Sequence, residues 1–248
     1  MVKHFIIMSK SYSDQTRIAL DIFKSEEFNE KYITGVIEGI KSACGEDTPI
    51  STHSICSDAE SWASVIKTDL FFKGVKIIDS VEEFIMKINR GRVLTGRDVA
   101  QYILSKLSCT HLKLENLCYL CYADYLIKGN GHLFEDKIYA FKYGPVIDSV
   151  YEEFKVYGNL EITDNEKTIE KQEKMEIQCR SRIIFAENGL KKVQSIDETL
   201  EKYGRLYASE LVRITHKKGT PWDLVYNGDM YGEISDDEIL KGHSKEYV

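Results

Sequence analysis

Apolar positions in the first 90 residues follow two spacings. Short apolar runs at residues 4–8 and 75–78 predict two buried strands. In residues 30–44 apolar side chains recur at every fourth position, which predicts a helix. We assign residues 16–24 to a helix as well. The mixture predicts a small α/β unit at the N-terminus.

The first part of the chain contains one further turn and one further helix, and it ends at a polar stretch. Residues 48–58 are polar and predict the turn. Ser80 with Glu83 three positions later has the form of a capping box, which predicts a helix continuing through Ile88. The polar stretch 89–92 contains a glycine and is the expected boundary. We therefore expect an N-terminal unit over residues 1–90, and a second domain over residues 91–248.

Helix signals become clearer after the boundary. Thr95 is a suitable N-cap with Asp98 three residues later. The segment from residue 112 to 127 is apolar on nearly every side. A helix without a polar face is packed on several sides, so this segment is predicted to be the central helix of its domain.

A corner is predicted after the central helix. Residues 133–143 alternate weakly and predict an extended segment. Gly144 and Pro145 follow, and proline suits the first turn of a helix because its missing N–H would have no partner there. We interpret the pair as a strand-to-helix corner, with a helix ending at Gly158. The free N–H groups of that helix suggest, as a hypothesis, a site for an anion or an acidic side chain.

The remaining segments are mostly helical. Residues 163–174 are charged and predict a solvated loop, and residues 181–186 predict a short extended piece. Helices are predicted over 190–203 and 207–214, and a capping box at 234–239 begins the last one. The predicted fold class is α+β, mainly α: a helical domain with a short extended or hairpin element, plus the small α/β unit.

Charge and composition narrow the possible partners. The formal net charge is −7, from 40 acidic and 33 basic residues without a basic block, so nucleic-acid binding is disfavoured. Fifteen tyrosines favour a protein-recognition surface, because tyrosine combines a large apolar ring with a polar tip. No apolar run is long enough for a membrane span or a signal-peptide core, and the expected location is the cytoplasm.

The cysteines and histidines offer candidate chemistry that the pattern does not support. Cys118 and Cys121 have metal-ligand spacing near His111, yet no second pair follows, and we reject a metal site. A catalytic thiol needs an exposed, electropositive setting, which an apolar helix does not provide. Cys109 is better placed but has no supporting motif. We expect six free thiols in or near the core, no catalytic residues and no cofactor.

Three ordered stretches carry a family resemblance. The first runs from Leu112 to Tyr119, and the second centres on Tyr143-Gly144-Pro145-Val146. The third is Thr215-His216 followed by Pro221-Trp222. Together they resemble the Panacea (SocA-like) antitoxin domain over about residues 93–245. The sequence departs from the family pattern at Asn116, Phe141 and His132, where the family usually has Lys, Trp and Pro.

The resemblance implies a helical protein-binding module that neutralises a partner toxin by direct contact. In one branch of the family the domain delivers its toxin to a protease, and many members sit on phages and mobile elements. Two alternatives therefore stay open: an anti-defence inhibitor of a host immune protein, and a protease adaptor. The role of residues 1–90 and the oligomeric state are open too.

The expected partner-binding surface follows from the same stretches. His216 has two interpretations: it is an imidazolium at a helix C-terminus, or it frames a pocket or partner contact together with Pro221-Trp222, since tryptophan is a frequent interface anchor. The residues expected to take part in partner binding are Lys113, Tyr119, Tyr143, Gly144, Pro145, Tyr151, His216 and Trp222.

Overall fold

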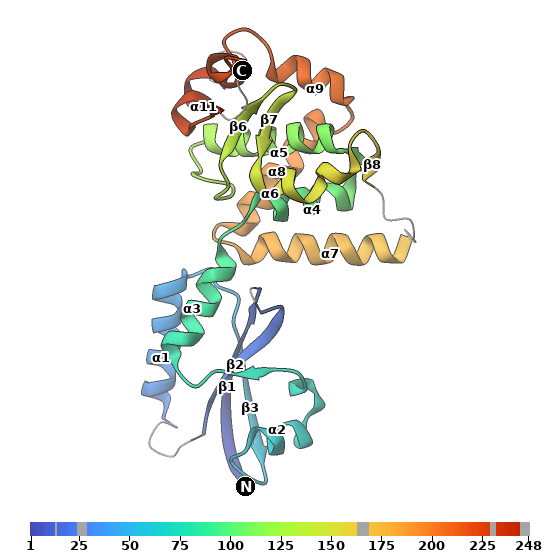
Figure 1. Cartoon of the computed structure of the whole chain (residues 1–248). Coiled ribbons are helices and arrows are strands. Elements are labelled where there is room, and N and C mark those ends of the chain that lie inside the picture. Colours follow the sequence, from blue (N-terminus) through green and yellow to red (C-terminus); the bar gives the residue numbers. More distant parts are fainter. Residues whose placement is uncertain (13, 24–28, 163–168, 229–231, 244–248) are drawn as a thin grey trace. The chain divides into compact units, whose positions relative to one another are not determined.

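The computed structural model describes residues 1–12, 14–23, 29–162, 169–228 and 232–243 (Figure 1). The chain forms two compact units, which we describe separately. Unit 1 consists of Met1–Val93 with Phe185–Glu187, and unit 2 of Leu94–Ile184 with Asn188–Val248. The predicted fold class, mainly helical α+β, is confirmed.

Unit 1 is built on a four-stranded sheet in the order β3-β1-β2-β4. The strands are β1 (Val2–Ser11), β2 (Thr16–Ile22), β3 (Ser51–Ser57) and β4 (Lys76–Ile77). β1 pairs antiparallel with β2 and β3, and β4 pairs parallel with β2. The helix predicted from residue 16 is wrong, because Ile18, Leu20 and Ile22 alternate onto one face of the sheet. The turn predicted at 48–58 is also wrong, since β3 is a mostly polar edge strand.

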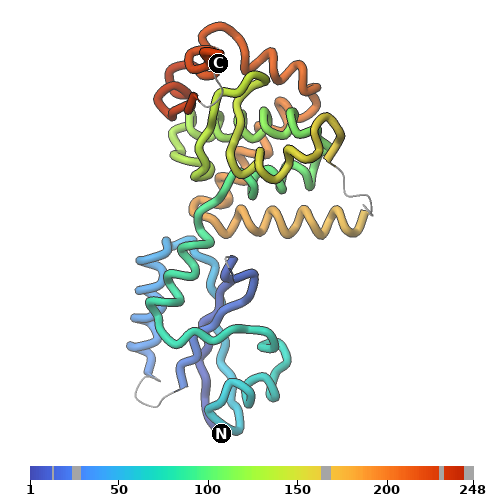
Figure 2. The backbone as a smooth tube through the Cα atoms, in the orientation of Figure 1, coloured from blue at the N-terminus to red at the C-terminus, as the bar shows by residue number. Residues whose placement is uncertain are grey.

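Helices lie against both faces of this sheet. They are α1 (Glu30–Cys44), α2 (Trp62–Thr68), the 3₁₀ turn η1 (Leu70–Phe72) and α3 (Val81–Arg92). α1 and α3 run side by side and share a core with Ile7 of β1 (Figures 1 and 2). On the opposite face Ile6 and Met8 pack with Val65 and Phe72 from α2 and η1. Successive residues of β1 therefore point to opposite faces of the sheet and contribute to two hydrophobic layers.

The helix that opens at Ser80 is confirmed, but it is longer than expected. The Ser80 hydroxyl accepts a hydrogen bond from the Glu83 N–H. Residues 89–92, predicted as a polar boundary, instead form the last turn of α3. Arg92 is 5% exposed and forms an ion pair with Asp47, so this turn belongs to the core of unit 1.

Unit 2 is arranged around one central helix, as predicted. α5 (His111–Ile127) is buried on nearly every side. The helices packed against it are α4 (Gly96–Lys106), α6 (Asp148–Phe154), α8 (Gly189–Tyr203), α9 (Ala208–Thr215) and α11 (Asp236–His243). The capping boxes at Thr95–Asp98 and Ser235–Glu238 are both present.

The predicted strand-to-helix corner at Gly144-Pro145 is wrong. β6 (Ile138–Phe141) and β7 (Gly144–Ile147) form a hairpin with a two-residue turn, and β9 (Gly232–Glu233) flanks β6. Pro145 is tolerated because β7 is an edge strand. α6 begins only at Asp148, so Gly144 and Pro145 do not form its N-terminus and the anion-site hypothesis loses its basis.

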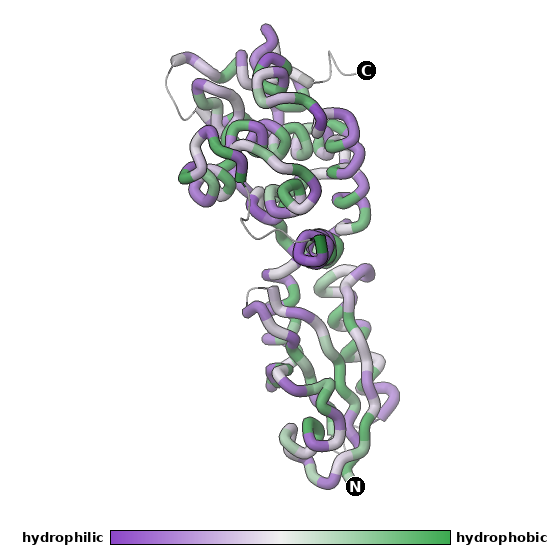
Figure 3. The backbone as a smooth tube through the Cα atoms, turned by 90° about the vertical axis from the view of Figure 1, so that its right-hand side faces the viewer, coloured by the Kyte–Doolittle hydropathy of each residue, from purple (hydrophilic) through white to green (hydrophobic). Residues whose placement is uncertain are grey.

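The other elements of unit 2 are short strands, a 3₁₀ turn and a polar helix. They are β5 (Cys109–Thr110), β8 (Glu161–Ile162), η2 (Lys155–Tyr157), α7 (Ile169–Phe185) and α10 (Pro221–Val225). The predictions of a loop over 169–174 and an extended piece at 181–186 are wrong, because both belong almost entirely to α7. Residues 163–168 lie outside the described residues. Hydrophilic residues predominate along α7, seen end-on in Figure 3.

Hydropathy also bears on membrane insertion. Among the residues that the structure describes, no helix combines the length and apolar character needed to cross a membrane.

Candidate partner-binding site

The β6–β7 hairpin presents Tyr143 to solvent. Lys142 and Tyr143 form the turn, and Phe141 pairs with Gly144 to close it. Gly144 has φ +131°, a conformation that residues with a Cβ rarely adopt. The Tyr143 side chain is 62% exposed, with the Lys142 ammonium 5.3 Å from its ring centroid. The short turn thus projects a large aromatic ring from a fixed backbone.

Trp222, in α10, binds the end of the hairpin. Its indole N–H donates to the carbonyl oxygen of Phe141 at 2.7 Å. Its ring stacks on Tyr226 with centroids 4.6 Å apart, and the centroid of the His216 ring lies 3.6 Å from that of Trp222. The rings of His216 and Trp222 are therefore in contact within the chain.

His216 does not act as the imidazolium that one interpretation required. Burial lowers the pKa of His216, so the ring is neutral near pH 7. Its Nε2 atom is buried and has no hydrogen-bond partner among the described residues. The residue caps α9 through its backbone N–H, which donates to the Val212 carbonyl, and its ring packs on Trp222.

Tyr151 extends the aromatic group along α6. Its ring centroid lies 5.5 Å from that of Phe141 and 5.5 Å from that of His111. The ammonium of Lys155 lies 5.3 Å from the same ring. Tyr151 is half-buried, so part of its surface remains open to a partner.

Two buried polar residues of α5 support the hairpin. The first is Glu115, whose carboxylate accepts hydrogen bonds from the Ile147 N–H at 2.9 Å and from His111 Nε2 at 3.2 Å. Burial raises the pKa of Glu115 above its ordinary value. The hydrogen bond from the Ile147 N–H to Glu115 holds the end of β7 at the point where the chain enters α6.

The second, Asn116, joins three elements. Its Nδ2 donates to the Leu112 carbonyl at 2.9 Å, and its Oδ1 accepts from the Thr215 hydroxyl at 3.0 Å. A Cβ at Gly144 would lie only 3.1 Å from that same Oδ1. The amide therefore lies where α5, α9 and β7 meet, which explains why glycine is needed at the start of β7.

Four of the predicted contact residues belong to the scaffold. Tyr119 is 1% exposed, and Gly144 and Pro145, in strand β7 of the hairpin, are buried. The Lys113 ammonium donates to the Gly204 carbonyl at 2.8 Å, which occupies it at the end of α8. Burial speaks against Tyr119, Gly144 and Pro145 as contact residues, whereas the contact role of Lys113 stays a prediction.

The structure adds two residues to the surface. Leu224 is 59% exposed and follows Trp222 in α10, and Tyr226 stacks directly on Trp222. The four-residue spacing of Trp222 and Tyr226 was a usable signal, because residues four apart share one side of a helical turn. We refer to Tyr143, Tyr151, Trp222, Leu224 and Tyr226 as the hairpin surface.

The cysteines show the expected burial in α5 but not everywhere. Cys118 and Cys121 are fully buried, and burial raises the pKa of both thiols, which keeps them protonated at neutral pH. Cys56, expected in or near the core, is exposed. No group of three or more potential metal ligands occurs within the described part of the chain.

Comparisons with known proteins relate the chain to one family of antitoxins, and the family match lies mostly in unit 2. The family model described as "Antitoxin SocA-like, Panacea domain" matches residues 116–223, a range that includes Tyr143, Tyr151 and Trp222 of the hairpin surface. The protein Antitoxin SocA of Caulobacter vibrioides (strain NA1000 / CB15N) is 30% identical over 139 residues, which are 54% of this chain and 71% of that protein. No solved structure matches the chain.

Proposed function

The chain belongs to the SocA-like Panacea domain family, and from this premise we propose that it is an antitoxin that neutralises a protein toxin by direct, stoichiometric contact. We place this action in the cytoplasm. The family relationship supports the antitoxin role, and the geometry of unit 2 supports contact through the hairpin surface.

One observation carries the proposed contact: an exposed tyrosine lies on a two-residue turn, and a tryptophan hydrogen-bonds the strand that leads into this turn. Tyr143 is 62% exposed, and the Trp222 hydrogen bond fixes the strand that leads into its turn. Tyrosine and tryptophan dominate the binding energy of many protein interfaces. A turn whose backbone is already in place loses little conformational entropy on binding, which favours affinity.

The chemistry around the hairpin surface favours binding over catalysis. Glu115 lies beneath β7 with its oxygens engaged by His111 and the Ile147 N–H. The two thiols of α5 are buried and protonated. Within the described residues, the exposed members of the surface are aromatic or aliphatic. We therefore propose that the protein acts without enzymatic activity of its own.

Co-expression with the protein encoded by the neighbouring gene tests the proposal. We expect that protein to stop growth when expressed alone, and growth to return when this chain is present. The two proteins should then copurify at a fixed ratio by size-exclusion chromatography. A neighbour that is harmless alone, or that stays toxic beside this chain, would contradict the antitoxin role.

Variants locate the contact. Tyr143→Ala combined with Leu224→Ala should abolish rescue and copurification while leaving the thermal unfolding of the chain unchanged. A matched control, Ile177→Ala with Leu190→Ala, removes two aliphatic side chains that are 66% and 70% exposed elsewhere, and should rescue fully. Rescue by both double variants would rule out the hairpin surface. Rescue that requires a host protease and depletes the toxin would replace stoichiometric neutralisation with delivery for degradation.

A further inference from the structure

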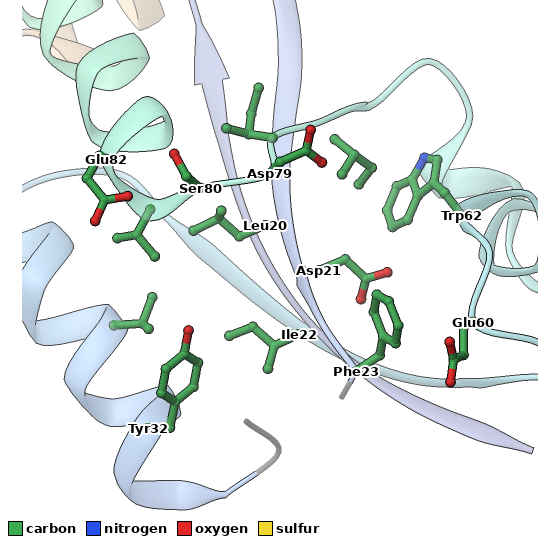
Figure 4. A pocket seen from close by; sticks show the side chains of 14 residues that line it. Leu20, Asp21, Ile22, Phe23, Tyr32, Glu60, Trp62, Asp79, Ser80 and Glu82 are labelled. Atoms are coloured by element: carbon green, nitrogen blue, oxygen red, sulfur yellow. The ribbon is translucent and has the colours of Figure 1, made fainter. Parts of the chain in front are cut away.

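Unit 1 contains a cavity of about 560 Å³ beside the end of β2, within the size range of small-ligand sites. β4 pairs with β2 only at Ile18 and Ala19, so the residues after these lie along the cavity. Figure 4 shows Asp21, Phe23, Trp62 and Glu60 gathered on one side in that view, with Tyr32 and Glu82 on the other.

The lining of the cavity is negatively charged. Asp21, Glu60, Asp79 and Glu82 contribute carboxyl groups, and none of the lining residues is lysine or arginine. Glu60, Asp79 and Glu82 are exposed and have no ion pair within the described part of the chain. Their charges add in the cavity, which attracts a cation. The rings of Phe23, Tyr32 and Trp62 also favour a cation, because an aromatic face carries partial negative charge.

Asp21 differs from the other three carboxyl groups because its side chain is buried and hydrogen-bonded to His4. Its side chain is 6% exposed, and both of its oxygens lie 2.9 Å from Nδ1 of His4. The other ring nitrogen, Nε2, lies 3.0 Å from the Ser57 hydroxyl oxygen. His4 is fully buried and Ser57 is 1% exposed, so the serine of this Asp-His-Ser chain cannot reach a substrate.

The hydrogen bonds fix the number of protons in this chain. The Ser57 hydroxyl donates its only proton to the Ala59 carbonyl, so its oxygen must accept from His4 Nε2–H. One proton then remains between His4 Nδ1 and Asp21. Whether it lies on the imidazole or on the carboxyl group, the pair is neutral as a whole. A cation beside Asp21 favours the carboxylate form, because an opposite charge stabilises the ionised state.

The Asp21–His4 pair therefore offers a counter-charge for a bound cation without leaving a bare buried charge when the cavity is empty. We propose that the cavity binds a ligand with an ammonium or guanidinium group, with Asp21 as the counter-charge and Phe23 and Trp62 as aromatic walls. This site belongs to unit 1, and it is independent of the proposed antitoxin function in unit 2.

Agmatine, which carries both an amine and a guanidinium group, is a suitable probe for the full-length chain. Two-dimensional ¹H–¹⁵N NMR resolves the indole N–H signals of the two tryptophans. The Trp62 signal should move in a saturable way while the Trp222 signal stays in place as an internal control. n-Butanol, a neutral probe with the same four-carbon chain, should move neither signal. The absence of a saturable Trp62 shift, or an equal response to n-butanol, would overturn the proposal.

Charge variants test which group binds the cation. Asp21→Asn should weaken agmatine binding by about tenfold or more, because it removes the buried counter-charge. Glu60→Gln, at an exposed position that carries no fold risk, should weaken it less, and binding should fall as salt rises. Glu38→Gln, an exposed acid of α1 outside the cavity, should bind as the wild type does. Unchanged affinity in both Asp21→Asn and Glu60→Gln would contradict the assignment.

Two sources of such a group are separated by a second probe. An arginine side chain presented by a partner protein is represented by the capped peptide acetyl-Gly-Arg-Gly-amide, and a free small amine by agmatine itself. Tighter binding of the peptide assigns the cavity to a partner's side chain, whereas tighter binding of agmatine assigns it to a small molecule. Failure of both probes would overturn the proposal without affecting the toxin-rescue test.

Discussion

The indole N–H of Trp222 donates to the carbonyl oxygen of Phe141 at 2.7 Å, joining residues 81 positions apart in the chain. Phe141 ends β6, directly before the turn that carries Tyr143. Through this one hydrogen bond, a five-residue helix positions the hairpin on which the proposed contact depends.

Trp222→Phe should lower the stability of unit 2 by about 1–3 kcal/mol, because the Phe141 carbonyl loses its side-chain donor while most of the ring packing remains. Urea unfolding followed by circular dichroism measures the change. Trp62→Phe is the matched control, since Trp62 Nε1 has no hydrogen-bond partner within the described residues, and it should cost less. Equal losses in both variants would show that the hydrogen bond contributes little.

Gly144→Ala should destabilise the protein by about 1–3 kcal/mol, because φ +131° is strained for alanine and the new Cβ meets the Asn116 amide. Gly35→Ala, in contrast, should increase the stability of the protein. Gly35 lies in α1 with nothing within 4 Å of the position that a Cβ would occupy, so alanine should stabilise unit 1 by about 0.5–1 kcal/mol. Thermal unfolding of both variants checks the pair, and a neutral Gly144→Ala would contradict the described turn.

Glu115 should make stability depend on pH. Burial raises the pKa of its carboxyl group, so the folded chain keeps a proton that the unfolded chain releases. Its contribution to stability therefore falls as pH rises from the unfolded pKa to the folded pKa. Glu115→Gln cannot ionise, so the stability of wild type relative to this variant should decrease as the pH rises above the ordinary glutamate pKa of 4.5. Urea unfolding at a series of pH values measures this difference, and a flat difference would be inconsistent with a raised pKa.

Arg182 should hold α7 against α4. Its Nε lies 3.1 Å from one oxygen of Asp98 and its Nη2 lies 3.1 Å from the other, and both side chains are mostly buried. Arg182→Ala should increase amide hydrogen exchange in α7 and cost about 1–3 kcal/mol. Arg213→Ala, at a 78% exposed position with a 4.0 Å pair to Glu210, should change stability by less than about 0.5 kcal/mol. Unchanged exchange in α7 would show that other contacts hold the helix.

The parts of the fold that the sequence predicted are those with strong local signals. α5 was recognisable because it has no polar face, and α4 and α11 because their capping residues stand three positions apart. β2 was misassigned although Ile18, Leu20 and Ile22 alternate, since helical spacing was preferred over a short period-two pattern. β3 has few apolar residues and is defined by its pairing with β1, which no local pattern reveals.

The sequence motifs led to the candidate site, but they did not separate exposed residues from buried ones. The motif containing Tyr143, Tyr151 and Trp222 led to the proposed hairpin surface, whereas Tyr119 and Pro145 of the same motif are buried. Gly144-Pro145 suited a helix start in local terms. The structure has a hairpin there instead, and it needs glycine at residue 144 because a Cβ would crowd the amide of Asn116, 28 positions earlier in the chain. Tertiary contacts of this kind are not visible in residue spacing.

The two-residue turn of the β6–β7 hairpin has a consequence for how the protein could change its partner. Because the backbone at Lys142 and Tyr143 is closed by the pairing of Phe141 with Gly144, substitutions of the two turn side chains leave the strands in place. Under the proposed contact, partner specificity can then change at these two positions without a change in the fold. The side chains of the turn can vary while the strands that support them stay the same, as binding loops vary on an antibody framework.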